Sequence, residues 1–197
     1  MEVDETARKY KRDEKYTYAD YAGWDDDERW ELIDGLAWLM APGPYEPHQG
    51  VSSDLVWQLS DFLRGKPCKL RHAPYDVRLN ADGEDDTVVQ PDIVVICDAS
   101  KMKKDGCAGA PDLVIEILSP SSVRHDTHRK FLAYKKAGVA EYWIVDPYSK
   151  TVQTHILNSG EYITHVYADA DEVPVSVLEG CVIKMEEVFA DMIGADS

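Results

Sequence analysis

The chain has 197 residues, of which 44% are hydrophobic and 29% charged, a balance typical of one soluble domain with a sizeable core. Its 37 acidic and 21 basic residues give a formal net charge of -16, which argues against general coating of nucleic acid. No apolar stretch approaches the roughly 20 residues of a membrane span, and the acidic N-terminus lacks the apolar segment of a signal peptide. The four cysteines form no CxxC pair. We therefore expect reduced thiols in a cytoplasmic protein that does not enter a membrane.

The N-terminal third predicts a tail, a short helix and a hairpin. Residues 1–16 are polar and charged, so we expect a flexible tail followed by a single domain over residues 17–197. Thr17 is a typical N-cap for a helix over residues 18–23. Two apolar runs within residues 29–40 flank Asp34-Gly35, a strong turn signal, and predict a β-hairpin. Glu31 shares a strand face with Ile33, which leaves an inward and a surface position equally open.

A long helix and a strand follow the hairpin. Apolar residues recur at helical spacing between Pro47 and Arg64, and Gly65 is a natural stop. His48 lies in the first turn of this helix, where it either caps or serves a site that faces this end. Residues 69–79 are expected to form one strand, followed by an acidic turn over residues 80–86.

Two almost unbroken apolar runs, residues 88–96 and 110–118, dominate the middle of the chain. Such runs are typical of central strands that are covered on both faces. Glu116 nevertheless lies in the middle of the second run, and Asp92 lies inside the first. A buried carboxylate is normally paired or bound to a metal. If the two strands are neighbours, Asp92 and Glu116 can converge on one divalent ion. Residues 98–109 between the runs are expected to be an exposed loop.

The C-terminal third predicts a second helix, a strand, a hairpin and a closing helix. Asp126 begins a helix that runs to Ala137, and Lys130 lies on its stripe of small apolar residues. A lysine in that position snorkels more often than it catalyses, but the nearby carboxylates favour a catalytic role. The remaining elements are a core strand over residues 141–147, a hairpin over residues 152–156 and 162–167, and a helix over residues 185–193.

The motifs together resemble a known family. Pro91-Asp92 and the later Glu116 resemble the restriction-endonuclease-like core of the PD-(D/E)XK superfamily. A closer resemblance, to a bacterial family of restriction endonucleases of unknown biological role, covers roughly residues 17–192. It rests on the segments 31–35, 47–49, 90–93, 110–121 and 134–147. The resemblance implies an α/β fold with a mixed central sheet flanked by helices and with N-terminal and C-terminal β-hairpin additions.

The resemblance also implies a site and a reaction. Asp92 and Glu116 would hold Mg²⁺, for which Mn²⁺ can substitute, with the Ile117 carbonyl as a further ligand. The metal would acidify a water that attacks a DNA phosphodiester bond. Lys130 would orient that water or offset phosphate charge, with Glu31 as a further catalytic candidate and His48 and Gln90 as supporting residues. Superfamily members often pair because two sites cut two strands, so a homodimer is an expectation by analogy.

One departure keeps alternatives open. The superfamily's lysine should stand two residues after Glu116, and that position is Leu118. A catalytically silent interaction module and a metal-dependent hydrolase of small phosphate esters therefore remain alternatives, as does a site without metal in which Glu116 merely pairs with Lys130. His125 and His128 lack a Cys pair and are not expected to bind zinc. Weak DNA binding would need a local basic groove, for which three groups are candidates: Lys66, Lys69 and Arg71; Lys101, Lys103 and Lys104; and Arg124, Arg129 and Lys130.

Overall fold

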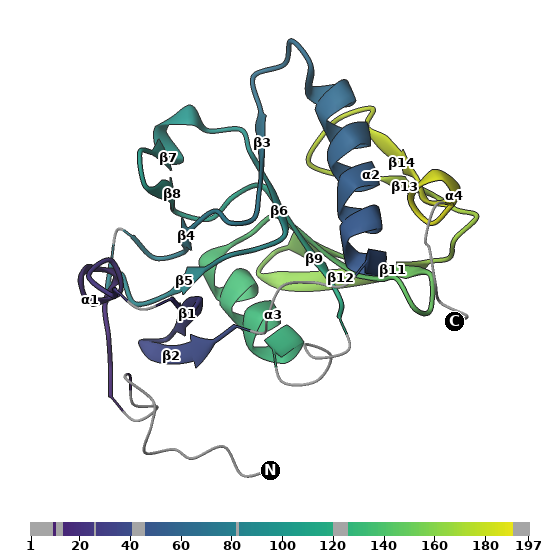
Figure 1. Cartoon of the computed structure of the whole chain (residues 1–197). Coiled ribbons are helices and arrows are strands. Elements are labelled where there is room, and N and C mark those ends of the chain that lie inside the picture. Colours follow the sequence, from purple (N-terminus) through teal and green to yellow (C-terminus); the bar gives the residue numbers. More distant parts are fainter. Residues whose placement is uncertain are drawn as a thin grey trace, which may run out of the picture.

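The computed structural model describes residues 10, 14–25, 27–40, 46–81, 83–119 and 126–190. Two six-stranded sheets organise these residues (Figure 1). The first, here the main sheet, has the strand order β12-β11-β10-β9-β6-β3. Its strands are β3 (Lys69–His72), β6 (Ile93–Ile96), β9 (Leu113–Ile117), β10 (Glu141–Asp146), β11 (Thr151–Asn158) and β12 (Glu161–Tyr167). Because β9 pairs parallel to β10 and antiparallel to β6, the predicted mixed sheet is confirmed.

The second sheet, here the side sheet, contains the predicted N-terminal hairpin and has the order β2-β1-β5-β4-β8-β7. Its strands are β1 (Trp30–Ile33), β2 (Leu36–Leu39), β4 (Val77–Arg78), β5 (Val88–Val89), β7 (Met102–Lys103) and β8 (Gly106–Ala108). The hairpin turns at Asp34 and Gly35, both at positive φ, as the Asp-Gly pair predicts. The remaining elements are α1 (Tyr18–Tyr21), α2 (Glu46–Leu63), the 3-10 turn η2 (Ala99–Lys101), α3 (Asp126–Ala137), β13 (Glu172–Pro174), β14 (Val182–Lys184) and α4 (Met185–Val188).

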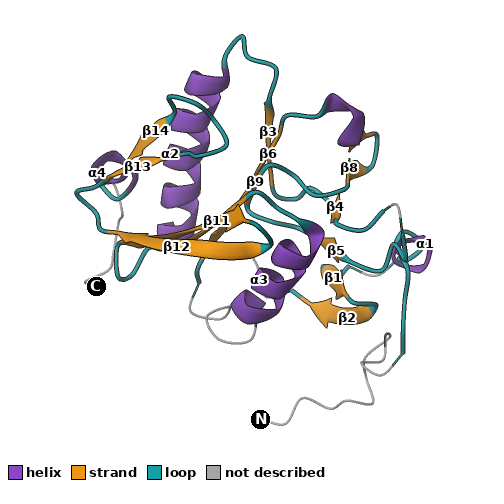
Figure 2. Cartoon of the chain, turned by 180° about the vertical axis from the view of Figure 1, so that it is seen from behind, coloured by secondary structure: helices purple, strands orange, loops and turns teal. Residues whose placement is uncertain are grey.

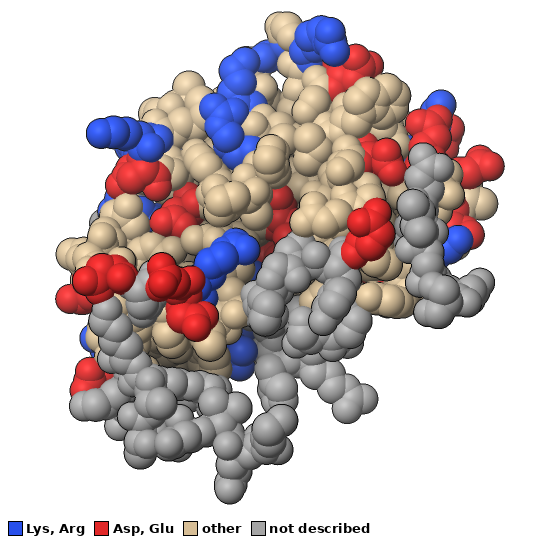
Figure 3. Space-filling model, viewed as in Figure 1, with Lys and Arg blue, Asp and Glu red and all other residues tan. Residues whose placement is uncertain are grey.

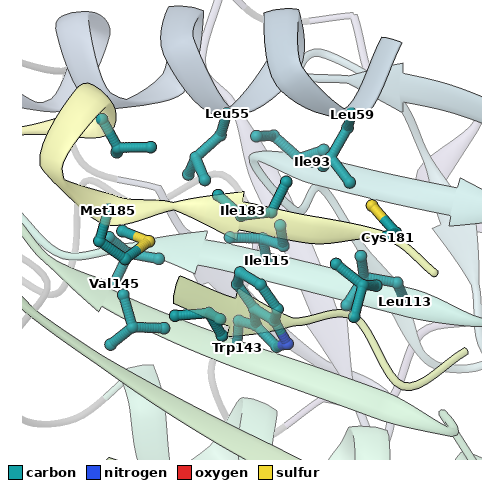
Figure 4. Close-up of a cluster of buried hydrophobic side chains, with 14 of the residues drawn as sticks. Leu55, Leu59, Ile93, Leu113, Ile115, Trp143, Val145, Cys181, Ile183 and Met185 are labelled. Atoms are coloured by element: carbon teal, nitrogen blue, oxygen red, sulfur yellow. The ribbon is translucent and has the colours of Figure 1, made fainter. Parts of the chain in front are cut away.

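Helices cover both faces of the main sheet, as its apolar runs predict. Residues at odd positions of β6 and β9, such as Ile93 and Ile115, pack with Leu55 and Leu59 of α2 (Figure 4). Residues at even positions, such as Val114, pack on the other face with α3. The view from behind shows α3 on the face away from α2 (Figure 2). Glu116 is at an even position and therefore lies on the face that α3 covers.

Three predicted elements differ from the structure. Residues 69–79 form two strands, β3 and β4, which belong to different sheets. The first strand ends before Ala73-Pro74, because a proline cannot donate a hydrogen bond to a strand ladder. Residues 98–109 contain η2 and the short β7–β8 hairpin instead of only a loop. The closing helix spans four residues, and the antiparallel pair β13–β14 before it was not predicted.

Part of the expected N-terminal tail is described by the structure, and some of its residues pack against the domain. Tyr10 is buried, and its ring stacks on Trp24 with centroids 3.8 Å apart. Tyr16 lies edge-on to the Tyr10 ring and donates its backbone N–H to the Gly35 carbonyl. These aromatic contacts pack this part of the segment against the face of the side sheet that carries Trp30. None of the helices in the described segments is both long and apolar enough for a membrane span.

The expectation of four reduced thiols is wrong for one pair. Cys68 and Cys97 form a disulfide, whereas Cys107 and Cys181 are free and buried. The register explains the pairing, because β3 and β6 run antiparallel with Lys69 opposite Ile96 and so bring the next residues, Cys68 and Cys97, together. Reduced thiols were one reason to expect a cytoplasmic location, and this reason does not hold for Cys68 and Cys97.

Candidate active site

The predicted site residues meet where the two sheets join. The chain leaves the side sheet at Val89 and enters the main sheet at Ile93, so residues 90–92 form the bridge between them. The first turn of α2 brings His48 to this bridge, and the first turns of α3 bring Lys130. Residues far apart in the sequence therefore converge at one place in the fold.

Asp92 lies across from Glu116. The register pairs Ile93 with Ile115, and one step outward along both antiparallel strands leads to Asp92 and Glu116. The Oδ2 atom of Asp92 accepts the backbone N–H of Ile117 at 2.8 Å and lies 3.1 Å from Nε2 of His48. These two contacts fix the orientation of the Asp92 carboxylate, whose side chain remains 20% exposed.

Lys130 joins the two glutamates. Its Nζ lies 3.1 Å from Oε1 of Glu116 and 2.9 Å from Oε1 of Glu31. Tyr134, one helical turn after Lys130 on α3, donates its hydroxyl to the same Glu116 oxygen at 2.6 Å. The Glu31 oxygen also accepts the backbone N–H of Gln90 at 2.8 Å. Glu31 is thus inward-facing and 2% exposed, which resolves the alternative left open by the sequence.

Burial governs the protonation of this cluster. Desolvation raises the pKa of Glu116 to about 8, the Lys130 ammonium opposes the shift, and the Asp92 and Glu31 carboxylates add to it. Burial and the adjacent Glu116 carboxylate raise the pKa of the Tyr134 phenol well above its usual value. The phenol therefore stays protonated and acts as a hydrogen-bond donor to Glu116.

The structure brings most of the candidate residues together, and two of them lie differently from the expectation. Gln90 contacts the cluster only through its backbone, because its side chain points to Arg29, Tyr21 and Asp76. Lys130 is buried, at 5% exposure, rather than open to a pocket. Leu118 shares the α3-covered face of the sheet with Glu116, and the ammonium that contacts Glu116 comes from helix α3 instead of from the strand. The Glu116–Lys130 pair is also what a purely structural interpretation predicts.

Tyr134 is the functional candidate that the sequence interpretation missed. Its position four residues after Lys130 is the signal that could have revealed it, since residues so spaced lie on one helix face. His125 lies outside the described residues, and His128 is exposed.

The carboxylates of Asp92 and Glu116 are the candidate ligands for a metal ion. Within the described segments, no three side chains from His, Cys, Asp and Glu are grouped so as to hold a metal ion. Two carboxylates with retained waters nevertheless suit Mg²⁺, which binds through few protein ligands. Across the described segments the hydrogen bonds to each acid go to one oxygen, Oδ2 of Asp92 and Oε1 of Glu116, so the second oxygens suit ligation.

The third predicted basic group reaches the carboxylates through Lys130, which contacts Glu116, whereas most of the first two groups lies farther along the sheet. Lys69 lies opposite Ile96, about 13 Å along β6 from Asp92, and the loop with Lys101 and Lys103 follows that same far end. Arg129 stacks over Trp38 with its guanidinium carbon 3.6 Å from the ring centroid. Arg124 lies outside the described residues. Figure 3 shows blue side chains over the upper part of the molecule, where β3 lies in Figure 1, with red ones spread over the rest of this face.

Comparison with known proteins gives the fold and the family. A crystal structure described as that of "a putative nuclease belonging to DUF820" from Anabaena variabilis ATCC 29413 superposes with a TM-score of 0.72. That match covers 88% of this chain and 97% of the other at 21% identity, so it supports the nuclease-like α/β fold. "Uncharacterized protein slr1290" of Synechocystis sp. (strain ATCC 27184 / PCC 6803 / Kazusa) is 25% identical over 163 residues, 81% of this chain and 84% of that protein. The model of the Uma2 family, described as "Putative restriction endonuclease", matches residues 17–186, and the chain belongs to that family.

Proposed function

We propose that this protein is a Mg²⁺-dependent endonuclease that hydrolyses DNA phosphodiester bonds. The observation that carries the proposal is the facing pair Asp92 and Glu116 with the Lys130 ammonium bound to Glu116. Membership of a family described as restriction endonucleases supports the nuclease assignment.

Asp92 and Glu116 would hold the metal, with the Ile117 carbonyl as a third ligand. In a strand the N–H and C=O of one residue point to the same side. The Ile117 N–H donates to Asp92, so its carbonyl is directed toward the same edge. When bound, the ion would acidify a water and stabilise charge on the phosphate.

The other residues have distinct proposed roles. His48 and the Ile117 N–H hold one oxygen of Asp92, which leaves the other oxygen directed away from both. Tyr134 and Lys130 do the same for Glu116. Lys130 also places a positive charge beside the position of the scissile phosphate, and Glu31 fixes the ammonium there. Outer contacts of this kind commonly change metal affinity about 10–100-fold.

DNA binding is expected to be weak and steeply salt-dependent. The net charge of -16 repels the phosphate backbone, and apart from Lys130 most of the basic candidates lie away from the carboxylates. A homodimer, which would present two sites to two strands, stays a prediction that light scattering can test.

A silent nuclease fold that binds another protein is the second candidate. Leu118 in the usual lysine position and the acidic surface favour it. If the fold is catalytically silent, the contacts of Lys130 with Glu31 and Glu116 serve stability alone.

One assay separates the two candidates. Purified protein is incubated with plasmid and single-stranded DNA at low salt, with and without millimolar-scale Mg²⁺ or Mn²⁺, beside the variant Asp92→Ala. The nuclease proposal expects metal-dependent cleavage that disappears in the variant. Equal cleavage by Asp92→Ala would reveal a contaminant, and neither cleavage nor metal binding in any condition would support the silent fold.

A further inference from the structure

A second hollow lies at the same end of the side sheet, on the opposite face from Lys130. It is a pocket of about 540 Å³ lined by the aromatic residues Tyr18, Tyr21, Trp24 and Trp30 and by polar residues that include Asp76 and Gln90. Trp30 and Glu31 are consecutive in β1 and point to opposite faces. The strand therefore presents Trp30 to this pocket and Glu31 to the candidate active site.

Hydrogen bonds fix the polar wall of the pocket. The Gln90 amide donates to Oδ1 of Asp76 at 2.8 Å and to the Tyr21 hydroxyl at 3.1 Å. The Arg29 guanidinium donates to the side-chain oxygen Oε1 of Gln90 at 2.7 Å and 3.2 Å. The Tyr18 hydroxyl donates to Asp105 at 2.7 Å. The pocket thus combines ring surfaces with a prearranged set of acceptors.

Gln90 connects the pocket to the candidate active site. Its backbone N–H binds Glu31, whereas its side chain lines the pocket. It precedes Asp92 by two residues, which span about 7 Å when extended. This length along the backbone is on the scale of one nucleotide. A strand that runs round this end of the side sheet would place one phosphate at Asp92 and an adjoining base in the pocket.

The charge of the lining selects the part of a nucleotide that fits. Glu28, Asp76 and Asp105 outnumber Arg29, so a phosphate is repelled. A base is uncharged, and its ring gains from stacking on aromatic side chains. Carboxylates accept hydrogen bonds from exocyclic amino groups, as Asp does from cytosine. Thymine carries no such group.

We propose that this pocket binds one base of the substrate strand beside the phosphodiester held at Asp92 and Glu116, and that it prefers a base with an exocyclic amino group. The inference rests on the proposed endonuclease function. It adds a recognition site formed by α1, the start of β1 and the bridge at Gln90.

Binding is measured in wild-type protein with Ca²⁺ in place of Mg²⁺, because Asp92→Ala would remove a residue that holds the phosphodiester. Fluorescence anisotropy at low salt compares single-stranded oligonucleotides that carry one cytosine, one thymine or one abasic site in an otherwise fixed sequence. The cytosine strand is expected to bind about tenfold or more tightly than the abasic strand, which corresponds to the usual gain from one stacked base. The thymine strand is expected to lie between them.

A substitution that fills the pocket can be compared with the same substitution outside it. Ala22, directly after α1, is exposed and lines the pocket, whereas Ala19, inside α1, is exposed and does not. Ala22→Phe is expected to remove the preference for the cytosine strand, and Ala19→Phe to keep it. In Asp76→Asn the ratio between cytosine and thymine strands is expected to fall toward one, because the amide replaces an acceptor with a donor.

The outcomes separate this inference from the function on which it rests. If wild-type protein cleaves DNA but the cytosine and abasic strands bind equally, the pocket proposal fails and the endonuclease proposal stands. If no strand binds and none is cleaved, both fail. Saturable quenching of tryptophan fluorescence by arginine amide, with none by deoxycytidine and with loss in Ala22→Phe, would identify a cation pocket and also overturn the inference.

Discussion

The Nζ of Lys130 lies 2.9 Å from Oε1 of Glu31, which ties helix α3 to strand β1 of the side sheet. The same ammonium lies 3.1 Å from Glu116 in the main sheet. One buried cation thus joins the two sheets at the point where the candidate metal ligands lie. Two carboxylates that share one ammonium depend on it, because an unpaired buried charge is costly.

Lys130→Met is therefore expected to lower the free energy of unfolding by about 3–5 kcal/mol, since it leaves Glu31 and Glu116 buried together without their cation. Urea unfolding monitored by circular dichroism measures the loss. Lys136→Met is the control, because the exposed Lys136 on the same helix pairs with the exposed Asp34 and should cost at most about 1 kcal/mol. Equal losses in the two variants would show that the buried contacts contribute nothing special.

Glu116→Gln is expected to stabilise the metal-free protein increasingly as pH rises. The folded protein holds the Glu116 proton up to about pH 8, whereas the unfolded chain releases it near its usual, lower pKa. Between those values the folded state binds more protons, so the wild type loses stability as pH increases and the variant escapes this loss. Thermal melts at pH 5 and pH 8 should show a Tm advantage of a few degrees for the variant, present mainly at pH 8.

The control for this pH dependence is Glu172→Gln, whose side chain is exposed on β13. It should show no such growing advantage. A Glu116→Gln protein that unfolds at both pH values would instead mean that the charge of Glu116 holds the fold together.

Local patterns predicted the positions of Asp92, Glu116 and Lys130 better than the contacts around them. The apolar runs indicated central strands, and their antiparallel register alone carries Asp92 to Glu116. Helical spacing placed Lys130 on the inward face of α3. The Gln90 side chain could not be placed, because its partners Tyr21 and Asp76 come from segments that no local pattern joins. The split of β3 from β4 and the Cys68–Cys97 bond likewise depend on pairing with a strand more than twenty residues away.

Removal of the disulfide is expected to weaken the fold and spare the site. The bond closes a loop with a sequence separation of 29, for which chain entropy gives about 3–4 kcal/mol. Cys97 follows the end of β6 that is remote from Asp92, so the contacts of the carboxylates should persist. The variant Cys68→Ser/Cys97→Ser should therefore melt at lower temperature and bind divalent metal with unchanged affinity below its Tm. A simultaneous loss of metal affinity would show that β6 transmits the change.

The last prediction concerns the hydroxyl that the sequence interpretation overlooked. Tyr134→Phe removes the donor to Oε1 of Glu116 and keeps the buried ring. Tyr162→Phe is its matched control, because the Tyr162 hydroxyl donates at 2.9 Å to the Val139 carbonyl, away from the carboxylates. Each variant is expected to lose roughly 1–2 kcal/mol of stability through one lost hydrogen bond.

Only Tyr134→Phe should also weaken divalent metal binding, by about tenfold or more, because Glu116 then relies on Lys130 alone for its orientation. Isothermal titration with Mn²⁺ measures that affinity, and the cleavage assay gives an independent readout. If both variants lose stability and neither changes metal affinity, Tyr134 packs the core and does not position Glu116. If Tyr162→Phe weakens metal binding equally, the effect comes from general loosening of the fold.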